Sequence, residues 1–334
     1  MRHPIRVIQF GLGAIGRAAA RLALEKDGMK LVGAIDQAPE FAGRDLGEVL
    51  ELPRTLGVPV SRQPGDVIGK VDAEAVIHCT GSSFAGVYDQ FALVARSGLH
   101  CVSSCEEALF PSYRAPKLAS ELHDLCVQHK VAMVGTGVNP GFAMDTLALV
   151  LSAVSQRVDA VRVLRVVDAG TRREALQRKV GAGLTEAEFH ALAAQKKIRH
   201  VGLSESLVML ATGLGWDLDQ VDETIAPVFA DGPIRTRYLM VEKGHVAGVE
   251  QTATGMRDGR VVVTLELRMY VGATDPRDHI EIDGEPPLRL TLDGGAPGDV
   301  ATPAILVNTL PRLLEAIPGW HTMMSLALPR YCRC

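Results

Sequence analysis

The sequence predicts an α/β protein with two domains: an N-terminal domain with a parallel sheet, and an α+β domain with a mainly antiparallel, open sheet. In the first 142 residues, apolar strand-like runs alternate with helical stretches at the spacing of βαβ units. Longer runs with period-two alternation dominate the second half. A chain of 334 residues also exceeds what one hydrophobic core usually holds. We therefore assign residues 1–142 to the first domain, completed by a C-terminal helix at 302–317, and residues 143–300 to the second.

The first strand-to-helix turn has the glycine spacing that is typical of dinucleotide binding. Residues 5–8 resemble a strand and residues 18–25 a helix, with G-x-G-x-x-G between them. The first glycine permits a tight turn, the second lets a pyrophosphate approach, and the third allows close packing of helix and strand. N–H groups at the helix start attract the anion. This predicts a Rossmann dinucleotide-binding domain whose cofactor-binding residues here are Gly11, Gly13, Ala14, Ile15 and Gly16.

Asp36 follows the second strand, 30–35, where this fold places a carboxylate on the ribose. A carboxylate there accepts from the 2′-hydroxyl and repels a 2′-phosphate, which favours NAD. The alternative is an exposed acid that caps a turn before Pro39. Because Arg44 is near in sequence and could neutralise a 2′-phosphate, NADP use also stays open.

Polar residues follow two further strands of this domain. The strand at 73–79 ends at small and hydroxyl residues, where a doubly wound sheet forms its cofactor crevice. The strand at 131–135 leads to Asn139, whose amide could bind the nicotinamide or fix the loop before Pro140. An ordinary turn would explain either segment. The predicted cofactor contacts are Thr80, Gly81, Ser82 and Asn139.

Glu106 and Glu107 follow the strand at 100–104 and are the best candidates for proton transfer. Burial at the end of a parallel strand raises a carboxyl pKa and can make the group a general base near neutral pH. Consecutive residues face opposite ways, so one carboxylate should face the substrate while the other caps the following segment. We favour Glu106 for the substrate. A solvated acidic turn is the competing interpretation.

The second half carries fewer candidates for function. Asp258-Gly259 precedes an alternating run and predicts a hairpin turn. Thr302 and Pro303 predict an N-cap and first residue of the C-terminal helix. Asn308 in that helix could contact the cofactor or another helix, and Phe142 could line an apolar substrate pocket or belong to the core.

The composition excludes several classes of partner. A formal net charge of −4 gives no electrostatic reason to bind nucleic acid or an anionic membrane. No apolar run approaches the roughly 20 residues that span a bilayer, and the first strand begins too early for a signal peptide. We therefore expect a cytoplasmic protein. The 6 cysteines and 10 histidines show no metal-ligand spacing, so we predict no metal, and we place Cys332 and Cys334 in a frayed tail.

Four segments together resemble the native amine dehydrogenases and 2,4-diaminopentanoate dehydrogenases, a branch of the dihydrodipicolinate reductase-like group. These segments are residues 10–16, 102–111, 135–142 and 298–308. The resemblance implies a homodimer, NAD or NADP in an interdomain cleft, and a second domain for substrate binding and dimerisation. It also implies that a glutamate handles the amine proton while an amine is reversibly deaminated to a ketone or aldehyde and ammonia.

Three functions are compatible with these residues. The first is an NAD(P)-dependent amine dehydrogenase, for which a lone carboxylate suits a substrate whose nitrogen carries the proton. The second is a 2,4-diaminopentanoate dehydrogenase or another oxidoreductase of this group that acts on an imine or semialdehyde. The third is a non-enzymatic dinucleotide sensor, which needs no buried carboxylate beside the nicotinamide. The sequence names neither the physiological amine nor the stereochemistry.

Overall fold

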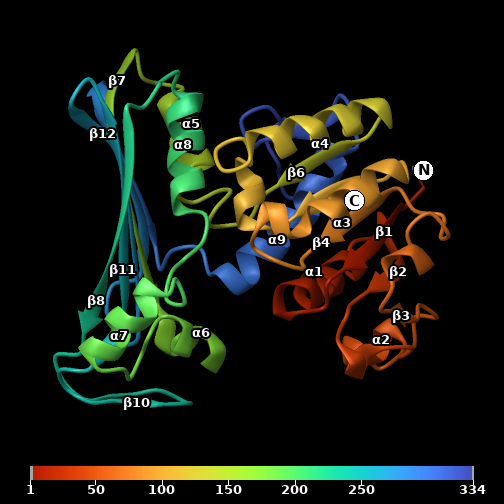
Figure 1. Ribbon diagram of the computed structural model, residues 1–334, viewed down its shortest axis with the longest axis horizontal. Helices are drawn as coiled ribbons and strands as arrows, with labels where there is room; N and C mark the ends of the chain where they lie inside the picture. The colour runs from red at the N-terminus through yellow and green to blue at the C-terminus, as the bar shows by residue number, and fades with distance from the viewer. Residues whose placement is uncertain (1–2, 333–334) are drawn as a thin grey trace. The chain divides into compact units, whose positions relative to one another are not determined.

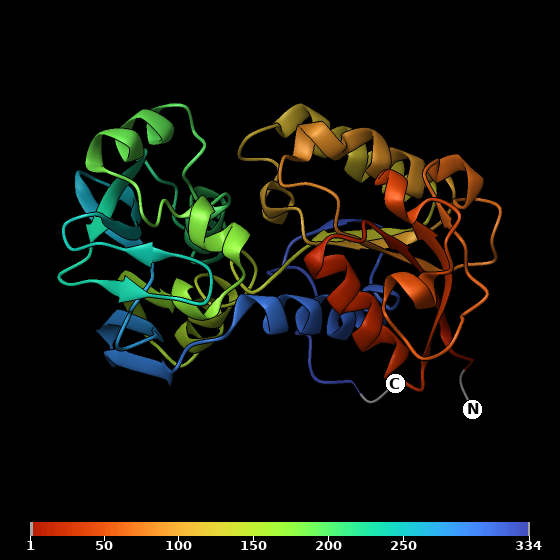
Figure 2. The same ribbon diagram turned by 90° about the horizontal axis from the view of Figure 1, so that it is seen from below.

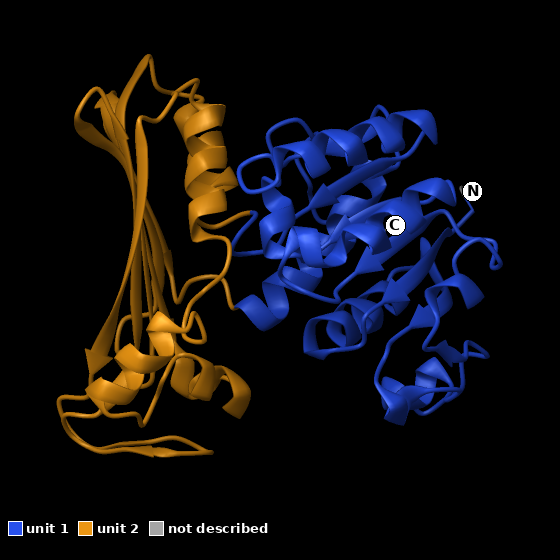
Figure 3. Ribbon diagram, in the orientation of Figure 1, with its two compact units in different colours: residues 1–141, 298–334 blue, residues 142–297 orange. Residues whose placement is uncertain are grey.

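The structure is a computed structural model that describes residues 3–332 and divides into two compact units (Figure 3). Unit 1 comprises the described residues up to Gly141 and those from Gly298 onward. Unit 2 comprises Phe142–Pro297. No helix within the described residues is long and apolar enough to cross a membrane.

Unit 1 is built on a parallel sheet with the strand order β15-β6-β5-β4-β1-β2-β3 (Figure 1). Each of its described strand pairs is parallel, which confirms the predicted Rossmann-like domain. The carboxyl ends of the central strands therefore meet at one edge, where this fold binds its ligands. The strands are β1 (Ile5–Phe10), β2 (Met29–Ile35), β3 (Val60–Ser61), β4 (Ala75–His78), β5 (His100–Ser103), β6 (Ala132–Gly135) and β15 (Gly319–His321).

Helices cover both faces of this sheet (Figure 2). Helices α1 (Ala14–Leu24) and α9 (Gly298–Leu313) contact each other on one face, and α3 (Phe84–Arg96) and α4 (Pro116–Gln128) do so on the other. The strands are apolar because they are buried on both faces; Val76 and Ile77 of β4, for example, are fully buried. The short helix α2 (Leu46–Val49) lies between β2 and β3, and a 3-10 turn, η3 (Glu106–Leu109), follows β5.

Helix α9 begins earlier than predicted. It starts at Gly298, so Thr302 and Pro303 lie inside it rather than at its N-cap and first position. Pro303 lies in the second turn and has no N–H for the carbonyl of Asp299, so α9 lacks one backbone hydrogen bond there. Leu306 and Leu310 of α9 are fully buried, whereas Ile317, the last residue of the predicted helix, lies beyond α9 and is 76% exposed.

Unit 2 contains a six-stranded sheet in the order β14-β13-β7-β12-β11-β8 among its described residues. Only β7 and β12 pair in parallel, so the sheet is mainly antiparallel, as predicted. Helices α5 and α8 pack on one of its faces (Figure 1). The elements are α5 (Thr146–Ser152), β7 (Arg157–Asp168), α6 (Glu174–Lys179), α7 (Glu186–Ala194), α8 (Leu203–Gly213), β8 (Gln220–Phe229), β11 (Val246–Arg257), β12 (Arg260–Tyr270), β13 (Arg277–Glu285) and β14 (Leu288–Asp293), with a small ribbon of β9 (Ile234–Arg235) and β10 (Met240–Val241).

The predicted hairpin turn at Asp258-Gly259 is confirmed. Arg257 pairs with Arg260 across the two-residue loop between β11 and β12. Both loop residues have positive φ, 52° at Asp258 and 71° at Gly259, as the preferred two-residue hairpin turn requires.

Candidate active site

The glycine turn of unit 1 has the geometry of a phosphate-binding turn. Gly11 has a φ of 93°, and a Cβ on it would lie 2.3 Å from the carbonyl oxygen of Cys79. A Cβ on Gly16 would lie 1.9 Å from the carbonyl oxygen of Gly11, so α1 and β1 can approach only at a glycine. Gly13 differs, because a Cβ there would meet nothing within 4 Å. The turn is therefore closed around its first and third glycines and open at its second.

The start of α1 is available to an anion. Its N-cap, Gly13, offers no side chain to the free N–H groups, and the first turn of the helix contains no acidic residue. Ala14 is exposed and Ile15 is partly exposed. Exposed N–H groups at the positive end of a helix dipole form a binding site for a phosphate group.

Asp36 lies directly beside this turn. Its Oδ2 accepts a hydrogen bond of 2.5 Å from the N–H of Leu12, and its Oδ1 accepts one of 2.8 Å from the N–H of Ala38. The carboxylate thus joins the end of β2 to the glycine turn. Asp36 is partly exposed, which leaves its outer edge accessible to a ribose hydroxyl.

A buried network around His78 fixes the end of β4, which sequence analysis did not single out. Cys105 donates its N–H to Ser103 Oγ at 3.0 Å, and the same hydroxyl forms a hydrogen bond of 2.9 Å with His78 Nδ1. His78 Nε2 then donates to Gln90 Oε1 at 2.8 Å, and the hydroxyl of Thr80 donates to the same oxygen at 2.7 Å. Burial lowers the pKa of His78 to about 4, with the Gln90 hydrogen bond acting the other way. The network holds a neutral imidazole below the exposed Thr80.

The adjacent carboxylates of η3 have different surroundings. Glu107 accepts a hydrogen bond of 2.8 Å from the N–H of Phe84, and its own N–H donates to the carbonyl of Ser82 at 3.1 Å. Glu107 therefore caps α3, which precedes it in the sequence; the expectation that the second carboxylate caps the following segment is wrong, because parallel strands place the start of α3 beside the end of β5. This contact also ties the predicted cofactor segment that contains the exposed Gly81 to the carboxylate pair.

Cys79 links Glu106 to the glycine turn. Burial raises the pKa of the Cys79 thiol to about 11, and the negative charge of Glu106 contributes to that rise. Cys79 in turn contacts Gly11 through its carbonyl oxygen. Glu106 is partly exposed. The structure thus brings Glu106, Cys79 and the glycine turn to the same edge of the sheet.

The loop after β6 presents unpaired polar atoms at this edge. Both amide atoms of Asn139 are buried and have no hydrogen-bond partner among the described residues, and neither does the Oγ1 of Thr136. Thr302 of α9 holds the loop by accepting a hydrogen bond of 3.3 Å from the N–H of Val138. The sequence does not distinguish Thr136 as a site residue, because a threonine after a strand is common in any turn.

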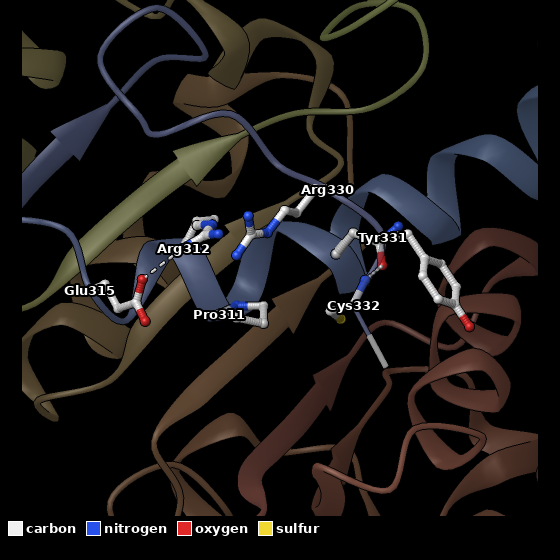
Figure 4. Close-up of a pocket in the computed structure, with 7 residues that line it drawn as sticks. Pro311, Arg312, Glu315, Arg330, Tyr331 and Cys332 are labelled. Carbon is white, nitrogen blue, oxygen red and sulfur yellow. Dashed lines mark hydrogen bonds and ion pairs between the residues drawn. The ribbon is translucent and has the colours of Figure 1, made fainter. Parts of the chain in front are cut away.

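Asn308 is occupied by the C-terminal segment. Its Oδ1 accepts a hydrogen bond of 3.2 Å from the N–H of Cys332, whose carbonyl accepts one of 2.8 Å from Lys26 Nζ. Cys332 is therefore tethered and not frayed as expected, while Cys334 lies outside the described residues. A cavity of about 300 Å³ lies at this place and is lined by Asn308, Pro311, Arg312, Glu315, Arg330, Tyr331 and Cys332. Figure 4 shows how its lining side chains lie.

Phe142 begins unit 2 and is partly exposed. Its carbonyl accepts a hydrogen bond of 2.9 Å from the N–H of Leu147. Its role in a substrate pocket stays a prediction, as do the roles of the other candidate residues.

Unit 1 fits a nicotinamide dinucleotide at three places. The second glycine faces open space, the start of α1 has no cap, and the buried amide of Asn139 is unpaired. A buried amide without partners costs free energy unless a ligand satisfies it, so it suits the carboxamide of a nicotinamide.

Known proteins are similar to this chain along nearly its whole length. The family model described as "2,4-diaminopentanoate dehydrogenase C-terminal domain" matches residues 142–333, and the model of the dihydrodipicolinate reductase N-terminus matches residues 5–105. A 2,4-diaminopentanoate dehydrogenase from Acetoanaerobium sticklandii is 29% identical over 98% of this chain and 94% of its own. An amine dehydrogenase from Streptomyces virginiae is 24% identical over 97% and 96%, respectively.

The solved structure of an amine dehydrogenase from Mycobacterium smegmatis superimposes with a TM-score of 0.86 at 26% identity, and the match covers 98% of each chain. These matches confirm the resemblance inferred from the sequence. The C-terminal family model alone covers more than half of the chain. The chain therefore belongs to the 2,4-diaminopentanoate dehydrogenase family.

Proposed function

We propose that the protein is an NAD(P)-dependent amine dehydrogenase that interconverts an amine with a ketone or aldehyde and ammonia. The observation that carries this proposal is the position of Glu106 at the same strand-end edge as the glycine turn: the charge of Glu106 acts on the thiol of Cys79, and the carbonyl oxygen of Cys79 lies beside Gly11. The amine dehydrogenases and the 2,4-diaminopentanoate dehydrogenase that align with nearly the whole chain support the same activity.

The residues of unit 1 would hold the cofactor by three kinds of contact. The N–H groups of Ala14 and Ile15 would bind the pyrophosphate, with Gly13 allowing the approach. Asp36 would accept from the ribose, and the amide of Asn139 would bind the carboxamide. Thr80, Gly81 and Ser82 would lie along the remaining part of the cofactor. When bound, the nicotinamide supplies the acceptor for the hydride.

Glu106 would manage the proton on nitrogen. In the direction of deamination, its carboxylate accepts a proton from the substrate ammonium, which leaves a neutral amine. Hydride departure from the adjacent carbon then gives an iminium ion, and the carboxylate stabilises that positive charge. Addition of water and loss of ammonia complete the reaction. Glu107, already engaged at the start of α3, would hold η3 in place so that Glu106 faces the substrate.

A 2,4-diaminopentanoate dehydrogenase is the second candidate, and the family match over residues 142–333 favours it. It differs from the first in its substrate, a diamino acid whose carboxylate needs a cationic partner. Both candidates share the same transfer of hydride and proton.

One experiment separates these functions. The purified full-length protein is incubated with NADH or NADPH, ammonium and a panel of small ketones and aldehydes, and in reverse with NAD⁺ or NADP⁺ and either simple amines or 2,4-diaminopentanoate. Ammonia-dependent oxidation of the cofactor supports the proposal, and a preference for the diamino acid selects the second candidate. Turnover without ammonia indicates an oxidoreductase of another kind. Cofactor binding without turnover on the whole panel indicates a sensor and contradicts the proposal.

We also propose that the protein acts as a homodimer through the sheet of unit 2. Residues that alternate with the buried ones, such as Arg268, face away from α5 and α8. Arg268 pairs with Glu250 at 3.0 Å and with Glu266 at 2.5 Å, so both signs of charge share this face. A face with mixed charges can complement a second copy of itself. Sedimentation of the full-length protein tests this, and a mass of one chain at micromolar concentration contradicts it.

A further inference from the structure

Arg62 lies beside Asp36 at the edge of the sheet. Strands β2 and β3 pair in parallel with Ile35 opposite Ser61, so Asp36 and Arg62 are the next positions on neighbouring strands. The N–H of Asp36 donates to the carbonyl of Ser61 at 3.0 Å, which continues the ladder up to this point. An arginine and an aspartate thus lie side by side where the fold places the ribose of a dinucleotide.

The guanidinium of Arg62 is directed to the segment after Asp36 without being neutralised there. Its Nε donates a hydrogen bond of 3.1 Å to the carbonyl oxygen of Gln37. No carboxylate among residues 3–332 forms an ion pair with it, and Asp66, a nearby acid, is paired with Lys70 at 3.3 Å. Arg62 is exposed, so the rest of its fork can reach a ligand.

Arg44, the arginine that the sequence suggested, has a different position. It pairs with Val60 of β3 through its backbone, but its guanidinium lies 3.5 Å from Glu48 Oε2 on α2. Its charge is therefore offset by an acid. Of the two arginines, Arg62 lies closer in register to Asp36 and lacks such a partner among the described residues.

Two backbone N–H groups, those of Leu12 and Ala38, donate to the Asp36 carboxylate and hold it in position. A hydroxyl can bind its outer edge, whereas a phosphate would be repelled unless a cation lies nearby. An arginine fork binds phosphate with two parallel hydrogen bonds and full charge.

We propose that Arg62 binds the 2′-phosphate of NADP(H), so that the site accepts both cofactors: Asp36 serves the ribose hydroxyl of NAD(H) and Arg62 serves the phosphate of NADP(H). This proposal rests on the proposed dinucleotide-dependent function. It assigns a specificity-determining role to a residue outside the glycine motif.

The test measures binding without substrate. Affinities for NADPH, NADH, 2′,5′-ADP and 5′-AMP are determined by titration calorimetry for the wild-type protein, Arg62→Ala and Arg62→Lys, with Arg44→Ala as the matched control. Arg62→Ala should weaken the binding of NADPH and of 2′,5′-ADP by about tenfold to a hundredfold, the range for a lost hydrogen bond to a charged group. The affinities for NADH and 5′-AMP should change by less than about twofold. Arg62→Lys should recover part of the lost NADPH affinity because lysine retains the charge.

Three results overturn the proposal. The first is an unchanged affinity for NADPH in Arg62→Ala, and the second is an equal loss of affinity for NADH and NADPH in that variant, which indicates contact with the adenine. The third is a loss of NADPH affinity in Arg44→Ala equal to that in Arg62→Ala. Because Arg62 is exposed, the variant should fold normally, and its thermal midpoint checks this. Failure of ammonia-dependent turnover with intact cofactor binding contradicts the proposed reaction and leaves this result standing. A wild-type protein that binds neither cofactor overturns both.

Discussion

The carboxylate of Glu107 accepts a hydrogen bond of 2.8 Å from the N–H of Phe84, the first residue of α3. The neighbouring Glu106 instead contributes its charge to the surroundings of Cys79, beside the glycine turn. Two consecutive glutamates therefore lie in different environments: one caps a helix, and the other lies near Cys79 at the edge of the sheet that carries the glycine turn.

Glu107→Ala should destabilise the protein by about 1 kcal/mol, the usual cost of removing a helix N-terminal acceptor. Glu107→Gln keeps an acceptor oxygen and should lose about half as much or less. Denaturant unfolding of the two variants checks this. Wild-type stability for Glu107→Ala would show that the contact with Phe84 does not hold α3.

The second and third glycines of the turn should lose very different amounts of stability when a methyl group is added. Gly16→Ala should lower the free energy of unfolding by at least about 2 kcal/mol, because its Cβ would lie 1.9 Å from the carbonyl oxygen of Gly11. Gly13→Ala should cost less than about 1 kcal/mol, since its Cβ meets nothing within 4 Å.

Gly13→Ala should nevertheless weaken NADH binding by at least about tenfold, because the methyl occupies the approach of the pyrophosphate. Unfolding curves and NADH titration measure the two quantities on the same samples. Normal NADH affinity in Gly13→Ala would remove this turn from the cofactor site.

Asp36→Asn should shift cofactor preference toward NADPH by about tenfold, the effect of removing one charge beside a phosphate. Asparagine keeps an acceptor for Leu12 or Ala38, so the turn should persist. The ratio of the dissociation constants for NADH and NADPH is the measurement. An unchanged ratio would mean that Asp36 does not face the ribose.

His78 should make the protein less stable in acid. Its pKa is lowered from 6.5 to about 4 by burial, so between these values the unfolded chain binds a proton that the folded protein does not. The contribution of His78 to the free energy of unfolding should fall as pH drops from 6.5 to 4, by up to about 3 kcal/mol at 1.36 kcal/mol per unit. Above pH 6.5 the contribution should be constant.

Unfolding curves of the wild type and His78→Gln across this range isolate the effect from that of the carboxylates. The difference in the free energy of unfolding between the wild type and His78→Gln should narrow as pH falls. For His190→Gln, which changes an exposed histidine, the free energy of unfolding should follow the same pH dependence as in the wild type. Parallel curves for His78→Gln would show that the imidazole titrates normally.

The sequence predicts those parts of the fold that depend on neighbouring residues. Gly11 and Gly16 indicate the turn because glycine suits a positive φ at Gly11 and the close backbone contact at Gly16. Asp258-Gly259 predicts its hairpin for a similar local reason, since both residues have positive φ. Contacts between distant segments could not be read in this way. Arg62 meets Gln37 only because β3 lies beside β2.

Helix α9 illustrates the same limit. Thr302-Pro303 is a good helix start by local chemistry, yet the helix begins at Gly298 and Thr302 instead accepts from the N–H of Val138. Asn308, which looked like a cofactor contact, accepts from Cys332 at the other end of the polypeptide. In both cases a partner far away in sequence decides what the side chain does.

The most direct test of the proposed function is the Glu106→Gln variant, assayed for ammonia-dependent oxidation of NADH with the best carbonyl substrate. The kcat should fall by about a hundredfold or more, the usual contribution of a positioned acid or base, while the NADH dissociation constant and the thermal midpoint stay near those of the wild type. A kcat equal to that of the wild type would contradict the assignment of Glu106 to the amine.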